Sequence, residues 1–514
     1  MTERVQVRLR PSGKLIEAQR GAPLRDILFP FGVEYPCGGK GQCKGCRVKV
    51  LSGSLPIQDS ERSMLSEREI EEGWRLSCQS RADADLEMEL GLWRPDVLVD
   101  HTRFEFVPRD GHGVAVDLGT TTLAVQLLDL SSGQVLAVQT ALNAQAKHGA
   151  DIMSRIAFAL EGQGARLLRD TARAQIGHLI RVLLRSAFPP ESGAGRPLPD
   201  KAIREIVVVG NTAMHHLFSG IDISPLASYP FEPIQDGECM FLSADLGWKL
   251  PGDPPVRFLP CLGGFVGSDL LAGVLATGLH ESEQLVGLID LGTNGEILLG
   301  NKDRILCTST AAGPAFEGAR ITRGMRAAPG AIHQVEPRNG ALNCHVLGGG
   351  PPRGICGSGL VDAVAAALDA GLLLPSGRFA DRSDRLVLLD PVALAQCDIR
   401  QLQLAKGAIA AGLRILSSRF GVREQDLSRV YLAGAFGNYI DRRSANRIGL
   451  LNLPPEKVEP SGNTALLGAK LALFEERGGR EVCEQVRSRT EHVSLSADPA
   501  FMEIYAEEMG FPAE

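Results

Sequence analysis

Features that mark several other functional classes are missing from this sequence. No apolar run reaches the roughly 18 residues that a membrane-spanning helix needs, and the first residues open into a strand pattern without the apolar core of a signal peptide. There is no tract of Lys and Arg, and the net charge is -7. This charge argues against nucleic acid as the main partner. We expect a cytoplasmic chain that binds neither membrane nor nucleic acid.

A dinucleotide fingerprint is also missing. No Gly-x-Gly-x-x-Gly stretch follows a strand pattern and opens a helix, so we expect no flavin or nicotinamide site. The composition is otherwise globular, with 44% hydrophobic residues and 58 glycines. At 514 residues the chain is too long for a single core and should divide into about three domains.

Four of the 11 cysteines show ligand spacing. Cys37, Cys43 and Cys46 are separated by five and two residues in one Gly-rich loop, and Cys78 follows after 31 more residues. Three thiolates on such a loop and a fourth from a distant strand end suit a 2Fe-2S cluster, which needs four soft ligands and close backbone amides. Structural zinc is the alternative, although zinc sites usually use two Cys-x-x-Cys pairs and only Cys43 and Cys46 form one.

The remaining cysteines have no ligand spacing, and in a cytosolic chain we expect buried apolar thiols rather than disulfides.

The domain boundaries follow from composition. We predict a small mixed domain over residues 1–92, an extended linker over 93–112 with Pro and Gly at both ends, and two larger parts over 113–285 and 286–514.

Two stretches with the same pattern open these larger parts. In each, an apolar strand ends in Asp, a Gly-Thr turn follows, and a second apolar strand returns. The two aspartates, Asp117 and Asp290, lie 173 positions apart. Backbone amides and hydroxyls of such a turn can hold phosphates while the carboxylate faces a metal ion. We therefore predict a duplicated domain with a nucleotide between its halves, held by Gly119, Thr120, Thr121, Gly292, Thr293 and Asn294.

A third Gly-rich turn follows a later strand pattern. In the stretch Gly434-Ala435-Phe436-Gly437-Asn438, the glycines would let a purine or ribose lie against the backbone. Alone this turn fits a packing role equally well, but after two phosphate turns it is the third part that a nucleotide site needs. Glu296 is our candidate for orienting the attacking water, and a solvated carboxylate is the alternative.

Several polar residues next to Gly-rich turns are predicted to begin helices. Thr212 follows the buried strand pattern of residues 204–209, and Ser268 or Asp269 precedes an apolar run. Ser358 is expected to cap one more helix, and Asp398 with Gln401 should form a capping box for another.

These motifs resemble two known groups. Asp117-Leu-Gly-Thr-Thr, Asp290-Leu-Gly-Thr-Asn and Gly434-Ala-Phe-Gly are similar to the phosphate and adenosine motifs of the acetate and sugar kinase, heat-shock chaperone and actin superfamily. Residues 210–216, 311–318, 355–360 and 432–439 resemble the reductive activators of corrinoid-dependent methyltransferase systems, which also carry an N-terminal 2Fe-2S domain with this cysteine spacing.

The resemblance implies an α/β multidomain chain, with a β-grasp 2Fe-2S ferredoxin domain before a duplicated ribonuclease H-like, actin-like ATPase fold. It implies ATP-dependent transfer of one electron from the cluster to an inactive Co(II) corrinoid, restoring Co(I). Asp117 and Asp290 would position Mg²⁺ through water. The partners would be a corrinoid protein and an upstream reductase, ferredoxin or flavodoxin, and the chain could form a homodimer. The short linker leaves little room for the extra middle domain of some members.

Two other functions remain open from the sequence. A small-molecule kinase of the sugar-kinase superfamily could use the ferredoxin domain as a redox sensor, but it needs a catalytic carboxylate and a substrate hydroxyl that the sequence does not clearly supply. A nucleotide-gated binding protein or chaperone could carry a purely structural cluster.

Overall fold

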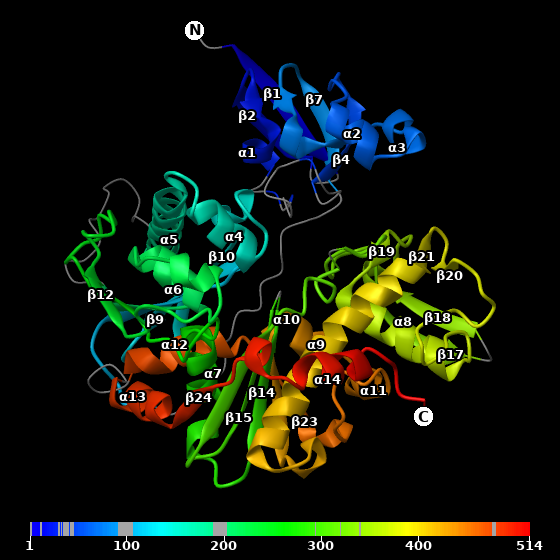
Figure 1. Ribbon diagram of the computed structural model, residues 1–514. Coiled ribbons are helices and arrows are strands. Elements are labelled where there is room, and N and C mark those ends of the chain that lie inside the picture. Colours follow the sequence, from blue (N-terminus) through cyan, green and yellow to red (C-terminus); the bar gives the residue numbers. More distant parts are fainter. Residues whose placement is uncertain are drawn as a thin grey trace.

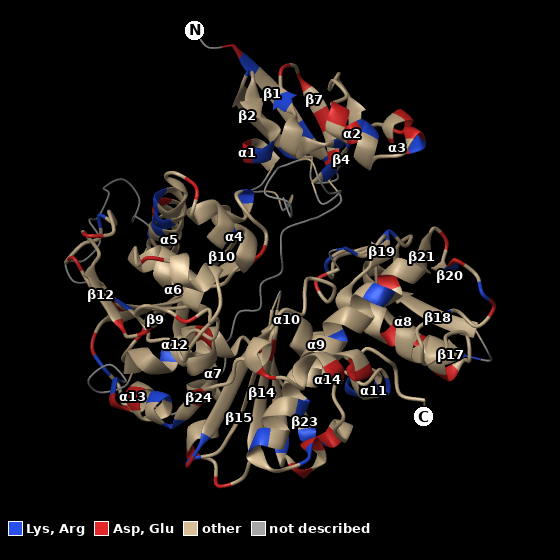
Figure 2. Cartoon of the chain, in the orientation of Figure 1, with Lys and Arg blue, Asp and Glu red and all other residues tan. Residues whose placement is uncertain are grey.

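The structure is a computed structural model. It describes residues 3–10, 13–28, 31, 33, 41, 46–90, 106–188, 203–292, 294–318, 320–338, 341–474 and 480–513. Figure 1 shows a small N-terminal domain above two larger parts, each built around its own sheet. Among the described residues, no helix combines the length and the apolar character that crossing a membrane requires. Acidic and basic residues are mixed along most elements (Figure 2).

The N-terminal domain is a five-stranded sheet with short helices. Its strand order is β2-β1-β7-β4-β5, with β1 antiparallel to β2 and parallel to β7. Val5, Val7 and Leu9 alternate with exposed residues along β1, and this alternation places one face of the strand in the core. The elements are β1 (Arg4–Arg10), β2 (Leu15–Gln19), β3 (Ala22–Pro23), α1 (Leu24–Leu28), β4 (Arg47–Ser52), α2 (Asp59–Met64), α3 (Glu67–Glu71), β5 (Trp74–Leu76), η2 (Ser77–Gln79), β6 (Arg81–Ala82) and β7 (Leu86–Leu90).

The first larger part contains a six-stranded sheet of order β10-β9-β8-β11-β13-β12. Its first three strands form an antiparallel meander, and β11 and β13 add in parallel. The elements are β8 (His112–Leu118), β9 (Thr122–Asp129), β10 (Val135–Leu142), η3 (Ala144–Lys147), α4 (Ile152–Ala159), α5 (Gly164–Ala187), β11 (Ile203–Val209), α6 (Thr212–Ser219), η4 (Ser224–Ala227), β12 (Cys239–Leu242), β13 (Pro255–Phe258), α7 (Ser268–Thr277) and η5 (Leu279–Glu281).

The second larger part repeats this topology. Strands β16-β15-β14 form an antiparallel meander, β22 and β23 follow in parallel, and β24 closes the other edge. Apart from an insertion, its elements are β14 (Val286–Leu291), β15 (Gly295–Gly300), β16 (Ile305–Thr310), α9 (Gln396–Phe420), η7 (Glu424–Asp426), β22 (Arg429–Ala433), α10 (Gly434–Tyr439), α11 (Arg442–Arg447), η8 (Pro455–Lys457), β23 (Val458–Gly462), α12 (Thr464–Phe474), α13 (Arg480–Arg489), β24 (Thr490–His492), η10 (Leu495–Ala497) and α14 (Phe501–Glu508).

An insertion separates β16 from α9 and forms the lobe at the right of Figure 1. It contains β17 (Ala331–Arg338), β18 (Ala341–Val346), η6 (Leu347–Gly349), β19 (Gly354–Ile355), α8 (Gly357–Asp369), β20 (Arg385–Leu389) and β21 (Val392–Ala395). The two equivalent sheets confirm the predicted duplication, because β8 and β14 hold the same place in each and carry Asp117 and Asp290.

Helices α7 and α12 join the two sheets. One apolar cluster combines residues of both sheets with residues of these helices, such as Leu271 and Leu466. The helices approach so closely that a Cβ atom on Gly468 would lie 2.0 Å from the carbonyl oxygen of Ala272. A larger residue at position 468 would therefore force the helices apart.

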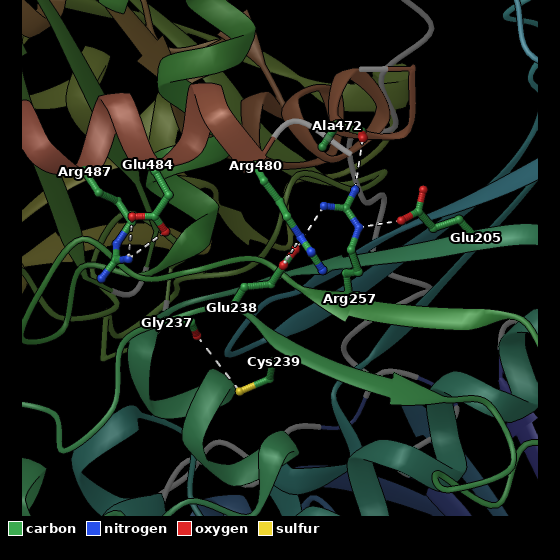
Figure 3. A network of polar contacts seen from close by, with 9 residues as sticks. All are labelled: Glu205, Gly237, Glu238, Cys239, Arg257, Ala472, Arg480, Glu484 and Arg487. Atoms are coloured by element: carbon green, nitrogen blue, oxygen red, sulfur yellow. Dashed lines mark hydrogen bonds and ion pairs between the residues drawn. The ribbon is translucent and has the colours of Figure 1, made fainter. Parts of the chain in front are cut away.

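A buried ion-pair network fastens α12 and α13 to the first sheet (Figure 3). Arg257 of β13 is 1% exposed and pairs with Glu205 and Glu238. Its Nη2 also donates to the carbonyl of Ala472 at 3.1 Å. Arg480 of α13 pairs with Glu238 at 2.6 Å. The end of the chain is thereby attached to a sheet formed more than 200 positions earlier.

The predicted helix caps were only partly right. Asn211, rather than Thr212, caps α6, and Thr212 instead donates to the carbonyl of Gly263. Ser358 lies inside α8 and donates to a carbonyl of β17, and neither Ser268 nor Asp269 caps α7. Asp398 does accept from the backbone near the start of α9, but from the N–H of Ala395, so Gln401 has no part in that cap.

Arg257→Met should lower the free energy of unfolding by about 3 kcal/mol, because Glu205 and Glu238 would lose their most buried partner and keep only the more exposed Arg109 and Arg480. Urea unfolding of the full chain measures this change. Arg429→Met is the matched control, since the Arg429–Glu459 pair is half exposed and should contribute under about 1 kcal/mol. Equal losses in both variants would contradict a special role for the network.

Candidate functional site

The two phosphate turns lie at equivalent ends of β8 and β14, with Asp117 and Asp290 near the strand ends. The carboxylate of Asp117 accepts a hydrogen bond from Asn463, which precedes α12, at 2.9 Å. Burial raises the pKa of Asp117 to about 6, and the hydrogen bond offsets part of the increase. Burial, followed by the nearby charge of Asp117, raises the pKa of Asp290 to about 7. The charge of Asp117, in the first half, therefore acts on Asp290, in the second.

Two further carboxyl groups belong to the same cluster. Burial and then the charges of Asp290 and Asp117 raise the pKa of Asp269, at the start of α7, to about 7. Burial and then the charges of Asp269 and Asp290 hold the pKa of Glu296 well above its usual range. The Ser309 hydroxyl donates to Glu296 at 3.4 Å. Sequence reasoning treated Asp269 only as a helix cap, and its place among the other carboxyls depends on how α7 packs.

The carboxyl cluster favours a hydrated cation. Carboxylates that repel one another are stabilised by a divalent ion. Within the described ranges, no three His, Cys, Asp or Glu side chains lie close enough to ligate one ion directly. Mg²⁺ usually keeps several of its waters and is held by few carboxylates. The residues present thus suit an ion bound through its waters.

The first phosphate turn is tight and held from the side. A Cβ atom on Gly119 would lie 2.6 Å from the carbonyl oxygen of Thr122, so the turn requires glycine there. The hydroxyl of Thr120 accepts from the side chain of Asn211 at 2.8 Å. In the second turn, the N–H of Gly292 donates to the carbonyl of Asn294 at 3.1 Å. Thr293 lies outside the described residues.

The third Gly-rich turn lies beside Asp290. Strand β22 pairs with β14 so that Ala433 is opposite Asp290. Gly434 follows with a φ of 84°, and a Cβ atom there would lie 2.6 Å from Oδ1 of Asp290. Only glycine fits this conformation and approach. The turn continues into α10 with Gly437, and the side chains of Ala435 and Asn438 lie outside the described residues.

Half of the predicted cluster site is described. Cys46 is buried, and its backbone carbonyl accepts from the N–H and hydroxyl of Ser77, next to Cys78. A hydrogen bond between the two thiol groups, the largest cause, lowers the pKa of Cys78 to about 7. These two sulfurs are therefore adjacent, as ligands of one centre must be. Cys37 and Cys43 lie outside the described residues, and the cysteines described in the structure form no disulfide.

Comparison with known proteins gives the same order of domains. Residues 7–83 match the 2Fe-2S iron-sulfur cluster binding domain, residues 112–282 the RACo middle region, and residues 284–514 the C-terminal domain of RACo, the ASKHA domain. The corrinoid activation enzyme RamQ of Eubacterium limosum is 35% identical over 451 residues, which are 81% of this chain and 74% of that protein. The chain belongs to the family of corrinoid-activating enzymes.

Two further relatives extend this comparison. The Co(II) methylated amine-specific corrinoid protein reductase of Methanosarcina barkeri is 27% identical over 78% of this chain and 77% of its own length. The solved structure of a reductive activator for a corrinoid, iron-sulfur protein superposes with a TM-score of 0.68 and 28% identity, covering 99% of this chain and 98% of that one. The predicted family, the fold and the enzyme class are confirmed.

One sequence-based expectation about this family was wrong. The short linker suggested that no middle domain was present, yet residues 112–282 match the middle region of the family. These residues form the sheet that we had assigned to the first ATPase half, and five of its strands, β10-β9-β8-β11-β13, follow the order of β16-β15-β14-β22-β23 in the second sheet. The 2Fe-2S and ASKHA matches establish a cluster domain and a nucleotide-binding domain.

The raised pKa values predict how pH affects the protein without metal or nucleotide. Asp290 binds a proton more tightly when folded, with a pKa of about 7 against 3.8. Stability should therefore fall as pH rises from about 4 to 7, and stay low above that. Asp290→Asn should stabilise the metal-free protein at pH 8, by roughly 2 kcal/mol, and have little effect near pH 4. Thermal unfolding in chelator measures this difference.

Asp303→Asn is the control for that measurement. Asp303 is exposed at the far end of the β15–β16 hairpin, so its replacement should leave the pH profile unchanged. A destabilised Asp290→Asn protein at pH 8 would show that the carboxyl cluster does not repel as its geometry indicates.

Proposed function

We propose that this protein is an ATP-dependent reductive activator of a corrinoid protein. It would return one electron to a partner whose cobalt has been oxidised to inactive Co(II), and so restore Co(I). The observation that carries the proposal is that one chain joins a 2Fe-2S domain to two equivalent nucleotide-binding sheets, in the order found along a reductive activator of a corrinoid protein. The bound cluster would supply the electron.

The nucleotide would lie between the phosphate turns. We assign the phosphates to Gly119, Thr120, Thr121, Gly292, Thr293 and Asn294. Asp117 and Asp290 would hold hydrated Mg²⁺, and the effect of the Asp117 charge on the pKa of Asp290 supports this assignment. The backbone of the third turn would contact adenosine through Gly434, Ala435, Gly437 and Asn438.

Two carboxyl groups are candidates for orienting the attacking water. Glu296 senses Asp269 and Asp290, whereas Asp269 senses Asp290 and Asp117. Asp269 therefore faces both phosphate turns, while Glu296 faces only the second. We propose Asp269 as the main water-orienting group and Glu296 as its neighbour in this role.

ATP hydrolysis would serve the electron transfer energetically. Plant-type clusters have potentials near about -400 mV, and each shortfall of roughly 60 mV costs about 1.4 kcal/mol for one electron. Closing the two halves with nucleotide can favour the partner conformation that is easier to reduce. A shift from about 1:99 to 99:1 needs roughly 5.5 kcal/mol of differential binding, which nucleotide and partner contacts together can provide.

The kinase alternative has less support than reductive activation. The relatives that match most of this chain are named as corrinoid activators or reductases.

An upstream protein electron donor is part of our proposal, because the sequence contains no dinucleotide fingerprint. A homodimer remains a prediction.

A cavity between α8 and α11 is our candidate for the adenine. It measures about 440 Å³ and is lined by α8 and α11, the helix that directly follows α10. Asp362 of α8 is 5% exposed, and its Oδ1 has no hydrogen-bond partner within the described residues. Burial raises the pKa of Asp362 to about 6, while hydrogen bonds with Ser444 and the backbone of Val335 oppose the increase. Its Oδ1 would accept from an amino group of the base. Adenine carries a donor at N6, whereas guanine carries an acceptor at O6.

Asp362→Asn should therefore reduce the preference for ATP over GTP by about tenfold, the effect of losing one charged hydrogen bond. Competition between the two nucleotides at equilibrium measures it. Asp369→Asn is the control, because Asp369 also lines the cavity but is already paired with Arg447. An unchanged preference in Asp362→Asn would place the base elsewhere.

The function itself is tested with the cluster-containing protein and a Co(II) corrinoid protein. Chemically reduced protein should form Co(I) only with Mg²⁺ and ATP, seen by the cobalt absorption spectrum. Asp117→Asn should lose at least about 90% of this rate, a barrier increase of about 1.4 kcal/mol, while its cluster still bleaches on reduction. A phosphorylated small molecule from a metabolite panel would favour the kinase, and a cluster that cannot be reduced would favour a structural role.

A further inference from the structure

Three consecutive carbonyl groups of the first phosphate turn are held from one side. The carbonyl of Gly119 accepts from the side chain of Asn143 at 2.9 Å, and that of Thr121 accepts from the N–H of Asn143 at 2.8 Å. Between them, the carbonyl of Thr120 accepts from Nη2 of Arg155. Across a trans peptide, the C=O and the following N–H point in opposite directions. The N–H of Thr120, which follows the carbonyl of Gly119, therefore points away from the side chain of Asn143, toward the side on which we place the phosphate.

Arg155 is a buried charge directly behind this turn. Its side chain is 0% exposed, and burial lowers its pKa to about 9, although Asp151 partly opposes the shift. Across the described part of the chain, no carboxylate lies within ion-pair distance of its guanidinium. Its other hydrogen bonds go to the carbonyl of Gly149 at 2.8 Å and to Gln145 at 3.3 Å. Such a group is costly to bury, and a phosphate at the turn would be its natural counter-charge.

The same residues build the segment that follows β10. Asn143 caps η3 by accepting from the N–H of Gln145 at 3.0 Å. The side chain of Gln145 accepts from both Asn143 and Arg155 and donates to the carbonyl of Leu168 in α5. Asn143 and Gln145 are both fully buried. The phosphate turn and η3 therefore form one hydrogen-bonded unit.

The N-terminal domain also packs against this segment. Leu142 belongs to the apolar core of that domain, and Ala144 and Ala146 pack against it. Beside them, Lys147 pairs with Asp26 of α1 at 2.9 Å. In Figure 1 the N-terminal domain lies next to β10 and α4. We call residues 142–147 the docking segment.

A second and smaller contact reaches the other larger part. Glu89 of β7 pairs with Arg353, just before β19, at 3.3 Å, and both side chains are about one-third exposed. An exposed pair of this kind contributes little and breaks easily. When the two sheets move relative to each other, the N-terminal domain is expected to stay with the docking segment and to lose or remake this pair.

We propose that Asn143 and Arg155 are positioning residues that couple nucleotide binding at the first phosphate turn to docking of the 2Fe-2S domain on residues 142–147. This inference rests on the proposed nucleotide site. Phosphate at the turn orders the carbonyls that hold η3, and an ordered η3 strengthens docking. Coupling between two binding events is reciprocal. If bound nucleotide strengthens docking by some factor, docking strengthens nucleotide binding by the same factor, so a variant that loses docking should bind nucleotide more weakly.

The first experiment perturbs docking from the surface. In Lys147→Glu, two carboxylates face each other at the docking segment, and the affinity for the ATP analogue AMPPNP with Mg²⁺ should fall about fivefold. Hydrogen exchange in α1 and η3 should rise in the same variant. The charge swap Lys147→Glu with Asp26→Lys should restore both. Lys302→Glu is the control, because Lys302 forms a comparable exposed pair with Glu283 far from the docking segment.

The second experiment removes the coupling itself. In wild type, AMPPNP should slow exchange at residues 144–147 and in α1. In Arg155→Met, the analogue should bind at least about fivefold more weakly and leave that exchange unchanged. Arg173→Met is the matched control, since Arg173 is a half-buried arginine of the same part that donates to the carbonyl of Phe218 and not to the turn. Should Arg155→Met fail to fold, the surface variants still decide the question.

The outcomes separate this inference from the proposed function. Unchanged AMPPNP affinity in a Lys147→Glu protein whose α1 exchanges faster would overturn the coupling, because docking and nucleotide binding would then be independent. In that case ATP-dependent cobalt reduction could still proceed, and the proposed function would stand. A wild-type protein that binds no nucleotide would overturn both.

Discussion

Electrostatic repulsion among four carboxyl groups is the constraint on which this architecture depends. These groups are Asp117 of β8, Asp269 of α7, Asp290 of β14 and Glu296 of β15. Burial raises the pKa of all four, and the charges of other members of the cluster raise the pKa values of Asp269, Asp290 and Glu296 further. Hydrogen bonds from Asn463, Ser309 and the N–H of Leu270 to these carboxyl groups offset part of the repulsion. A ligand that brings positive charge and accepts hydrogen bonds stabilises the closed arrangement. A ligand that binds between the two halves therefore changes the electrostatic energy of their arrangement.

The two sheets can respond together to a bound ligand only if they are connected, and helices α7 and α12 connect them. Each begins at the site, with Asp269 in the first turn of α7 and Asn463 just before α12. Their close approach at Gly468 leaves no side chain between the helix backbones. Helices in such contact slide or rotate as a pair more easily than they separate. Movement at the carboxyl cluster is thereby passed to both sheets together.

Much of this organisation could be predicted from local sequence. The repeated pattern of an apolar run that ends in Asp, a Gly-Thr turn and a second apolar run predicted both hairpins and their equivalence. Cysteine spacing similarly predicted the cluster domain. Helix caps were harder, because Thr212 and Ser358 compete with neighbouring donors and carbonyls that only tertiary packing brings close. Asp269 and Arg155 were missed for the same reason. Their partners lie on other elements, and nothing in their own sequence context distinguishes them from a cap and a helix arginine.

The attachment of α12 and α13 also determines when the protein can fold. The face of the first sheet that carries Ala115, Val207 and Val209 is covered partly by α12, whose residues follow roughly 250 to 350 positions later. Arg257 gains its hydrogen bond to the carbonyl of Ala472, and Glu238 its ion pair with Arg480, only after these C-terminal residues have been made. During synthesis, this apolar face remains open until nearly the whole chain has left the ribosome. The first sheet is thus dependent on the C-terminal helices, and a chain interrupted before them would expose an apolar surface inviting aggregation.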